Sequence, residues 1–156
     1  MARLKSDISL FLIDNFSSSE HVINELSARA RDMGFVDDTF SGNVIKREKE
    51  YPTGLPMGLP IAIPHIHEGC LTSFFAMALL TKPVYFFNMG DSTEKLMVEM
   101  VFLFGITDPS EQTAVLKKFA KTFQQTETLR DFQNSASPGE IAQKVQAVFG
   151  DFISIS

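Results

Sequence analysis

Two mainly apolar runs near the middle of the chain constrain its fold more than any other feature. Residues 72–80 and 97–106 contain a single charged side chain between them, and each run has the length of a strand rather than that of a helix. Continuous apolar runs are typical of strands that are buried on both faces of a sheet. Two shorter candidate strands, 61–63 and 84–87, lie close to them in the sequence. The middle of the chain therefore predicts a sheet that is covered on both sides.

Helical periodicity before these strands predicts part of that cover. Ser17, Ser18 and Ser19 offer N-cap oxygens, and Gly34 provides a stop for the helix that lies between them. Apolar side chains recur within this helix at helical spacing, at Val22, Ile23, Leu26, Ala30 and Met33. A second helix is expected to begin at Asp37 or Asp38.

Helical patterns also fill the last third of the chain. Asp108 followed by Pro109, and Ser137 followed by Pro138, each combine an N-cap with a proline at the first helical position. A short helix is expected between them, at 127–132. Helices at both ends with buried strands in the middle predict an α/β fold. We expect a single domain in which a mixed central β-sheet of about five strands is flanked by helices on both faces.

The charge balance and the cysteine count exclude several kinds of function. The chain has 14 basic and 19 acidic side chains and a net charge of −5, whereas a nucleic-acid-binding protein needs a basic surface. The single cysteine excludes an internal disulfide and suits a reducing cytosol. No apolar run reaches the ~18–20 residues of a membrane span, and the N-terminus lacks the pattern of a secretory signal. We expect a cytoplasmic protein with no nucleic-acid partner and no inserted segment.

A histidine directly after a short strand is the best candidate for chemistry. The segment 51–60 contains three prolines and two glycines, which exclude a helix, and the strand 61–63 that follows it stops at Pro64. His65 would then lie where a strand ends, at the edge where open α/β sheets form ligand-binding crevices. A histidine there serves as a general base, a metal ligand or a nucleophile, or simply as a hydrogen-bonded loop residue.

Arg47 and Thr53 are the groups expected near this histidine. The guanidinium of Arg47 offers a fork of donors that matches a phosphoryl group or a carboxylate; the alternative is a salt bridge, for example to Glu48. Thr53 would supply a hydroxyl. A histidine with an arginine and neutral donors beside it is what a phosphohistidine site needs, because the imidazole nitrogen attacks phosphorus and the donors hold the equatorial oxygens. Arg47 is expected to face inward because it shares a helical stripe with Phe40, Val44 and Tyr51.

The residues around this histidine resemble a known family. The string Arg-Glu-Lys-Glu-Tyr-Pro-Thr-Gly at 47–54, followed by Ile-Ala-Ile-Pro-His at 61–65, resembles the IIA component of the phosphoenolpyruvate-dependent sugar phosphotransferase system. Within this family the residues resemble the fructose/mannitol type, and most of all its galactitol-specific branch. It covers about 8–149, which would be the core of a single IIA domain spanning 1–156.

The resemblance implies a phosphotransferase component with a phosphohistidine intermediate, no cofactor and no metal. His65 would accept a phosphoryl group from the carrier protein HPr. It would pass this group to a cysteine of a IIB component, which serves a membrane permease, IIC, in the uptake of a sugar or polyol such as galactitol. Arg47 would hold the phosphoryl group, with support from Thr53 and Gln112. Gln112 aligns with a second histidine of many family members; a glutamine can donate a hydrogen bond but cannot relay a proton.

Two other interpretations remain open. A IIA-like regulatory module would keep the site and its phosphorylation at His65 while controlling another protein. A metal-dependent hydrolase would use His65 and His67, which share a face in an extended segment, with Cys70 or a carboxylate as a third ligand. No further histidine or cysteine lies nearby, which counts against a metal site. Outside that alternative, Cys70 is expected to be a small core residue and His21 a solvated surface residue.

Overall fold

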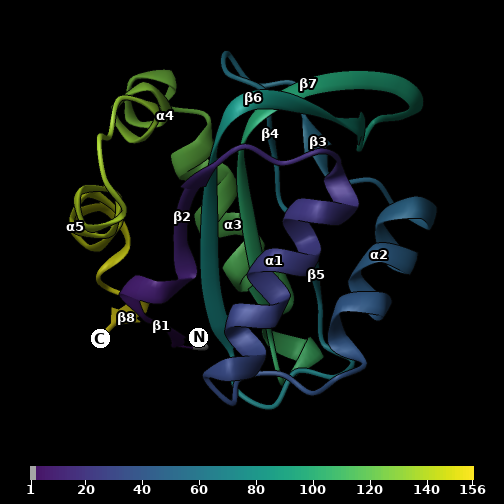
Figure 1. Cartoon of the computed structure of the whole chain (residues 1–156), viewed down its shortest axis with the longest axis vertical. Coiled ribbons are helices and arrows are strands. Elements are labelled where there is room, and N and C mark those ends of the chain that lie inside the picture. The colour runs from purple at the N-terminus through teal and green to yellow at the C-terminus, as the bar shows by residue number, and fades with distance from the viewer. Residues whose placement is uncertain (1–2) are drawn as a thin grey trace.

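One mixed β-sheet forms the centre of the computed structural model, which describes residues 3–156 (Figure 1). Within this range the sheet has eight strands, β1 (Leu4–Ser6), β2 (Phe11–Asp14), β3 (Gly54–Leu55), β4 (Ile61–Ala62), β5 (His65–Ile66), β6 (Phe74–Asn88), β7 (Asp91–Gly105) and β8 (Ile153–Ile155). The helices of the same range are α1 (Ser19–Asp32), α2 (Phe40–Glu50), α3 (Gln112–Phe123), α4 (Thr126–Gln133) and α5 (Pro138–Phe149), with short 3-10 turns η1 (Ile8–Leu10) and η2 (Pro109–Glu111). The predicted fold class, a single α/β domain with a mixed sheet and helices on both faces, is confirmed.

A long antiparallel hairpin, β6–β7, organises the sheet. The two strands pair along most of their length, while β2 adds to β6, and β4 and β5 add to β7, in parallel. The prediction of separate strands at 72–80 and 84–87 is wrong in one respect, because both segments belong to the single strand β6. A register shift between Leu79 and Val84 lets pairing continue past Pro83, which has no N–H to donate.

The sheet has more strands than the five predicted because most of them are very short. Six strands, β1, β2, β3, β4, β5 and β8, span two to four residues each. Segments of this length are too short to show a hydrophobic period. The predicted strand at 97–106 forms the second part of β7 and is buried from Met100 onward, whereas Met97 is 55% exposed.

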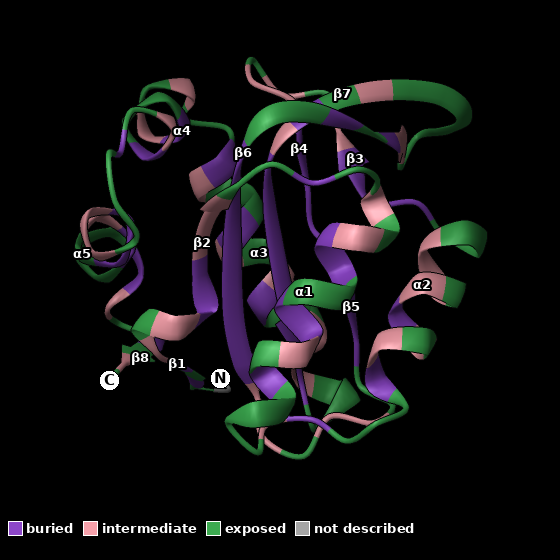
Figure 2. Ribbon diagram, viewed as in Figure 1, coloured by how far each residue is buried: buried purple, intermediate pink, exposed green. Residues whose placement is uncertain are grey.

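Alternate residues of the long hairpin face two separate cores, because successive side chains of a strand point to opposite faces. Phe75 and Met77 pack with helices α3, α4 and α5, whereas Ala76 and Ala78 pack with α1 and α2. Figure 2 shows the central strands buried between helices whose outer surfaces are exposed. The short strand β5 lies at one edge of this sheet. No helix within residues 3–156 is long and apolar enough to cross a lipid bilayer.

The helix boundaries follow the predicted caps with two exceptions. The second helix, α2, begins at Phe40 rather than at Asp37 or Asp38. The amide and hydroxyl of Thr39 both donate to the Asp37 carboxylate, at 2.8 and 2.6 Å, and form a turn before the helix can start. Asp108 accepts from the Ser110 amide and caps the turn η2, so α3 begins at Gln112 rather than at Pro109. The other predicted caps are present: Ser18 accepts from the His21 amide and Ser137 from the Glu140 amide.

His21 is less exposed than the solvated surface residue that the sequence predicted. Its Nδ1 accepts a hydrogen bond from the Ser17 amide at 3.0 Å, and its ring packs edge-on against Phe16 with the ring centroids 5.2 Å apart. The side chain is half-buried. His21 therefore has a structural part at the start of α1, far along the chain from the motif around His65.

Candidate functional site

His65 lies in the edge strand β5 and is almost completely buried. The predicted strand at 61–63 ends earlier, at Ala62, and His65 begins a second short strand that pairs in parallel with the end of β7. The imidazole stacks on Phe104, with ring centroids 4.7 Å apart and an interplanar angle of 8°. The residue is 6% exposed. Strand pairing on one side and the aromatic ring below hold the imidazole in a single place.

The proton of this imidazole is held on Nδ1. The Nδ1 atom lies 2.7 Å from the carbonyl oxygen of Ile63. A carbonyl oxygen only accepts, so Nδ1 must carry the hydrogen and donate it, and Nε2 of the neutral ring has a free lone pair. Burial lowers the pKa of His65, and the nearby positive charge of Arg47 lowers it further, although the hydrogen bond to Ile63 acts in the opposite direction. The geometry therefore presents a neutral ring whose nucleophilic nitrogen is Nε2.

Gln112 approaches this nitrogen from the face of the sheet that Phe104 and α3 share. It is the first residue of α3, which follows the turn η2. Its Nε2 lies 3.4 Å from Nε2 of His65, a long contact between an amide donor and the lone pair. The structure thus places an amide N–H at the atom where a group bound to the imidazole would sit.

Arg47 reaches the site from the last turn of α2. Arg47 is a half-buried residue, and the Cζ of its guanidinium lies 5.2 Å from the ring centroid of Tyr51. Tyr51 follows the end of α2 and is 62% exposed, so the predicted inward stripe stops before it. Among residues 3–156 the Arg47 guanidinium makes no hydrogen bond and no ion pair, so the alternative salt bridge is not formed there. Its five donors remain available to an anion.

Thr53 is buried, but its donors are already used. Its hydroxyl donates to Oε1 of Glu48 at 2.6 Å, and its amide donates to Oε2 of the same carboxylate at 2.7 Å. The hydroxyl therefore binds Glu48 and is not directed at His65. From the sequence, Glu48 was expected only as a possible salt-bridge partner of Arg47. Its position in a run of charged residues is typical of a solvated helix end.

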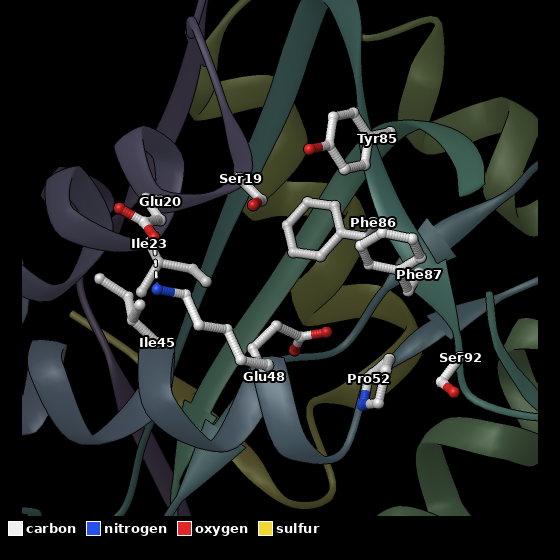
Figure 3. Close-up of a pocket in the computed structure, with 11 residues that line it drawn as sticks. Ser19, Glu20, Ile23, Ile45, Glu48, Pro52, Tyr85, Phe86, Phe87 and Ser92 are labelled. Carbon is white, nitrogen blue, oxygen red and sulfur yellow. Dashed lines mark ion pairs between the residues drawn. The ribbon is translucent and has the colours of Figure 1, made fainter. Parts of the chain in front are cut away.

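A cavity of about 250 Å³ lies beside Glu48 and does not include His65 (Figure 3). It is enclosed by the start of α1, the end of α2 and the strand β6, with Pro52 at its rim. Figure 3 shows the Glu48 carboxyl group pointing toward the rings of Phe86 and Phe87. Burial raises the pKa of Glu48 to about 7, although the two hydrogen bonds from Thr53 and the charge of Arg47 lower it.

The residues of the metal-binding alternative do not form a ligand set. Within residues 3–156 no group of three His, Cys, Asp or Glu side chains could hold a metal ion. The His67 side chain is 43% exposed, and its Nε2 lies 4.0 Å from a Glu68 oxygen. Cys70 is half-buried, donates its S–H to the Thr72 carbonyl at 3.1 Å, and has a pKa that burial raises to about 11. Cys70 therefore stays a protonated thiol at neutral pH.

Comparisons with known proteins agree on one family. Residues 5–147 match the family described as phosphoenolpyruvate-dependent sugar phosphotransferase system, EIIA 2. The galactitol-specific EIIA component of Escherichia coli (strain K12) is 32% identical over 117 residues, which cover 73% of each chain.

Solved structures share the fold. The crystal structure of IIA mannitol from Escherichia coli superposes with a TM-score of 0.71 at 17% identity, over 88% of this chain and 96% of that chain. A complex of enzyme IIA and phosphorylated enzyme IIB of the mannitol system, from the same organism, gives a TM-score of 0.70 at 15% identity, over 89% of this chain and 95% of that chain. At these identities the agreement concerns the fold.

Proposed function

The chain belongs to the EIIA 2 family of the phosphoenolpyruvate-dependent sugar phosphotransferase system, and we propose that it is a phosphocarrier that holds the phosphoryl group on Nε2 of His65. The observation that carries this proposal is the hydrogen bond from His65 Nδ1–H to the Ile63 carbonyl. That bond leaves Nε2 unprotonated, and the lowered pKa keeps it so at neutral pH. A neutral imidazole with a fixed free nitrogen is a ready nucleophile.

The reaction consists of two phosphoryl transfers. The lone pair of Nε2 attacks phosphorus in the phosphohistidine of HPr, the phosphorus–nitrogen bond of HPr breaks, and its imidazole leaves. With Nδ1 still protonated, the phosphorylated ring of His65 carries a positive charge, which the carbonyl dipole of Ile63 stabilises. A cysteine thiolate of a IIB component then attacks the same phosphorus, and the bond to Nε2 breaks with its electrons returned to the ring. His65 regains its neutral form.

Two side chains support these transfers directly. Arg47, whose donors are free, would bind phosphoryl oxygens in the planar transition state. Gln112 would donate its amide N–H to an oxygen of the same group, because that N–H already lies at Nε2. Thr53 would support the loop and not touch phosphorus, since both of its donors bind Glu48. The positive charge of Arg47 and the amide N–H of Gln112 complement the negative charge of phosphoryl oxygens.

The partners follow from the family. The complex of the mannitol enzyme IIA with phosphorylated IIB supports a IIB component as the recipient, and HPr would be the donor. The galactitol-specific relative supports a sugar or polyol such as galactitol as the compound taken up by the associated IIC permease. The assignments of the donor, the recipient and the transported compound rest on the family and its members and not on the geometry of His65.

The test is phosphorylation in a purified system. Phosphoenolpyruvate, enzyme I and HPr should place one acid-labile, alkali-stable phosphate on the protein. The variant His65→Ala should take up none, while the matched control His67→Ala should take up as much as the wild type. Phosphate incorporation into His65→Ala would show that the acceptor has been misassigned.

A second measurement separates transport from regulation. Phosphorylated protein mixed with a IIB component should lose its phosphate to the IIB cysteine within seconds to minutes. Retention of the phosphate in the presence of IIB, together with phosphorylation-dependent binding to another protein, would identify the regulatory module instead.

A further inference from the structure

One inward-facing carboxyl group beside the site has no part in the chemistry above. The carboxyl end of Glu48 lies near Pro52, Phe86 and Phe87 (Figure 3). The neighbouring lysine, Lys49, pairs with Glu20 at 3.1 Å, and no ion pair to Glu48 is formed within residues 3–156. A buried carboxyl group without a cationic partner costs free energy of folding. Such a cost is expected to be compensated by a specific contact.

That contact leads to His65 in three hydrogen-bonded steps. Thr53 donates twice to the Glu48 carboxylate. The carbonyl oxygen of Thr53 accepts from the Ile63 amide at 3.3 Å. The carbonyl oxygen of Ile63 accepts from Nδ1 of His65 at 2.7 Å. Thr53 lies directly before β3 and Ile63 lies directly after β4, and these two strands pair over two residues.

We propose that Glu48 is a positioning residue for His65: its carboxylate holds Thr53, and through Thr53 it fixes the Ile63 carbonyl that keeps the imidazole proton on Nδ1. The inference deepens the proposed function, because a fixed tautomer matters only if Nε2 is the nucleophile. The pairing of β3 with β6 and of β4 with β7 anchors the backbone that follows Thr53 and precedes Ile63. The bidentate contact with the end of α2 adds an anchor at Thr53 itself.

The alternative that Glu48 orients Arg47 fits the structure less well. The two side chains influence each other electrostatically, since the charge of Arg47 lowers the pKa of Glu48. They form no hydrogen bond or ion pair in the part of the chain that the structure describes. The carboxylate oxygens instead lie 2.6 and 2.7 Å from donors of Thr53. Glu48 therefore acts on the loop, whereas Arg47 keeps its donors for the phosphoryl group.

Four variants separate these roles. Glu48→Ala removes both acceptors of Thr53. Glu48→Gln keeps a carbonyl oxygen for the Thr53 amide, and its NH₂ group can donate to the Thr53 hydroxyl, so it should rescue the positioning. Thr53→Val removes the hydroxyl arm and leaves the amide arm. Glu50→Ala is the matched control, because Glu50 is an exposed residue at the end of the same helix.

The first readout is the tautomer of His65 in the unphosphorylated protein, measured by long-range ¹H–¹⁵N NMR. Wild type, Glu48→Gln and Glu50→Ala should show a protonated Nδ1 and an unprotonated Nε2. Glu48→Ala should show a mixture of both tautomers, because the Ile63 carbonyl no longer has a fixed position. Thr53→Val should lie between the two groups.

The second readout is steady-state turnover, in which phospho-HPr supplies the phosphoryl group to His65 and a IIB component removes it. Glu48→Ala should lower kcat by on the order of 10–100-fold, the effect of a small displacement of a reacting group, and should leave KM nearly unchanged. The double variant with Thr53→Val should be no slower than Glu48→Ala alone, because both changes break the same connection.

A folded Glu48→Ala protein with the wild-type tautomer and the wild-type kcat would overturn the proposal. If circular dichroism shows that Glu48→Ala is unfolded, Thr53→Val decides, and an unchanged tautomer and rate in that variant would overturn it equally. Failure of the wild type to accept phosphate would contradict the proposed function, whereas the tautomer spectra would still decide the role of Glu48.

Discussion

At the scale of single residues, the reactivity of the site depends on where one proton sits. Burial and the charge of Arg47 lower the pKa of His65, and the Ile63 carbonyl binds the proton on Nδ1. Since the pKa is lowered, the ring is neutral at and above its ordinary pKa of about 6.5. Nε2, which we propose as the nucleophile, is therefore unprotonated throughout the neutral pH range.

The amide of Gln112 should assist transfer without being essential. Replacement by alanine removes one donor 3.4 Å from Nε2, and the loss of a single hydrogen bond predicts a phosphorylation rate ~3–10-fold lower. Gln112→Ala should still reach one phosphate per chain. The matched control is Gln124→Ala at the exposed end of α3, which should transfer at the wild-type rate in the same stopped-flow experiment. Complete loss of phosphorylation in Gln112→Ala would assign a larger part to this residue.

The ionisation of Glu48 should make stability depend on pH. Its folded pKa is raised to about 7 from an ordinary value near 4.5. Between these values the folded chain holds a proton that the unfolded chain has released, so the free energy of unfolding falls as pH rises through this window. The shift corresponds to at most roughly 3 kcal/mol.

Glu48→Gln cannot ionise, so the test is a difference between two proteins. Its free energy of unfolding relative to wild type should rise by up to roughly 3 kcal/mol from pH 4.5 to pH 8. Urea denaturation at several pH values measures this. A difference that is constant across the pH range would contradict the raised pKa, whatever its absolute size.

At the scale of elements, the loop that carries Thr53 is located by its close approach to the long hairpin. Gly54 in β3 pairs with Asn88 in β6, and a Cβ atom at Gly54 would lie 2.5 Å from the carbonyl oxygen of Phe87. A contact this short with backbone cannot be relieved by a side-chain rotation. The glycine is needed because β3 lies directly against β6, and this contact sets the position of Thr53.

Gly54→Ala should therefore lower the free energy of unfolding by about 1–3 kcal/mol, the usual cost of overpacking. It should also slow phosphorylation, because the displaced strand moves Thr53 and Ile63. Gly42→Ala in α2 is the control, since its Cβ would meet nothing within 4 Å; it should raise stability by up to ~1 kcal/mol. If Gly54→Ala raised the melting temperature as much as Gly42→Ala does, β3 would be shown to be free to move.

Sequence patterns predicted the long elements well and the short ones poorly, for a physical reason. Helices such as α1 and α5 have both a capping residue and an apolar stripe, and these local signals agree. Strands such as β3 and β5 are formed by pairing with a distant partner and have no local signal of their own. The joining of 72–80 and 84–87 into β6 likewise depends on the partner strand, which keeps its pairing past Pro83.

At the scale of the whole molecule, the site combines residues from the two helical layers at one edge of the sheet. Arg47 comes from α2, which packs on the same face as α1, and Gln112 comes from α3, which packs on the opposite face. His65 lies on the edge strand between them. A position at an edge suits the function that we propose, because such a phosphocarrier would contact two protein partners in turn.

The candidate site could be predicted from the sequence as far as its residues have distinct chemistry. His65 and Arg47 were candidates because a phosphohistidine site requires a nucleophile and donors, whereas Gln112 was a candidate only through its alignment with the second histidine of the family that the sequence resembles. The hydrogen bonds of Thr53 could not be predicted from the sequence, because its contact with Glu48 depends on the way the loop folds back on the end of α2. Glu48 itself has no distinguishing signal, since its neighbours in the sequence are charged and its inward orientation is a property of the folded chain.

The most direct test of the account is to locate the phosphorus atom. Protein phosphorylated by phospho-HPr, with ¹⁵N-labelled histidine, should show phosphorus–nitrogen coupling at Nε2 of His65 and a retained proton on Nδ1. Phosphorus on Nδ1, on His21 or on His67, or the absence of any phosphohistidine, would contradict the account.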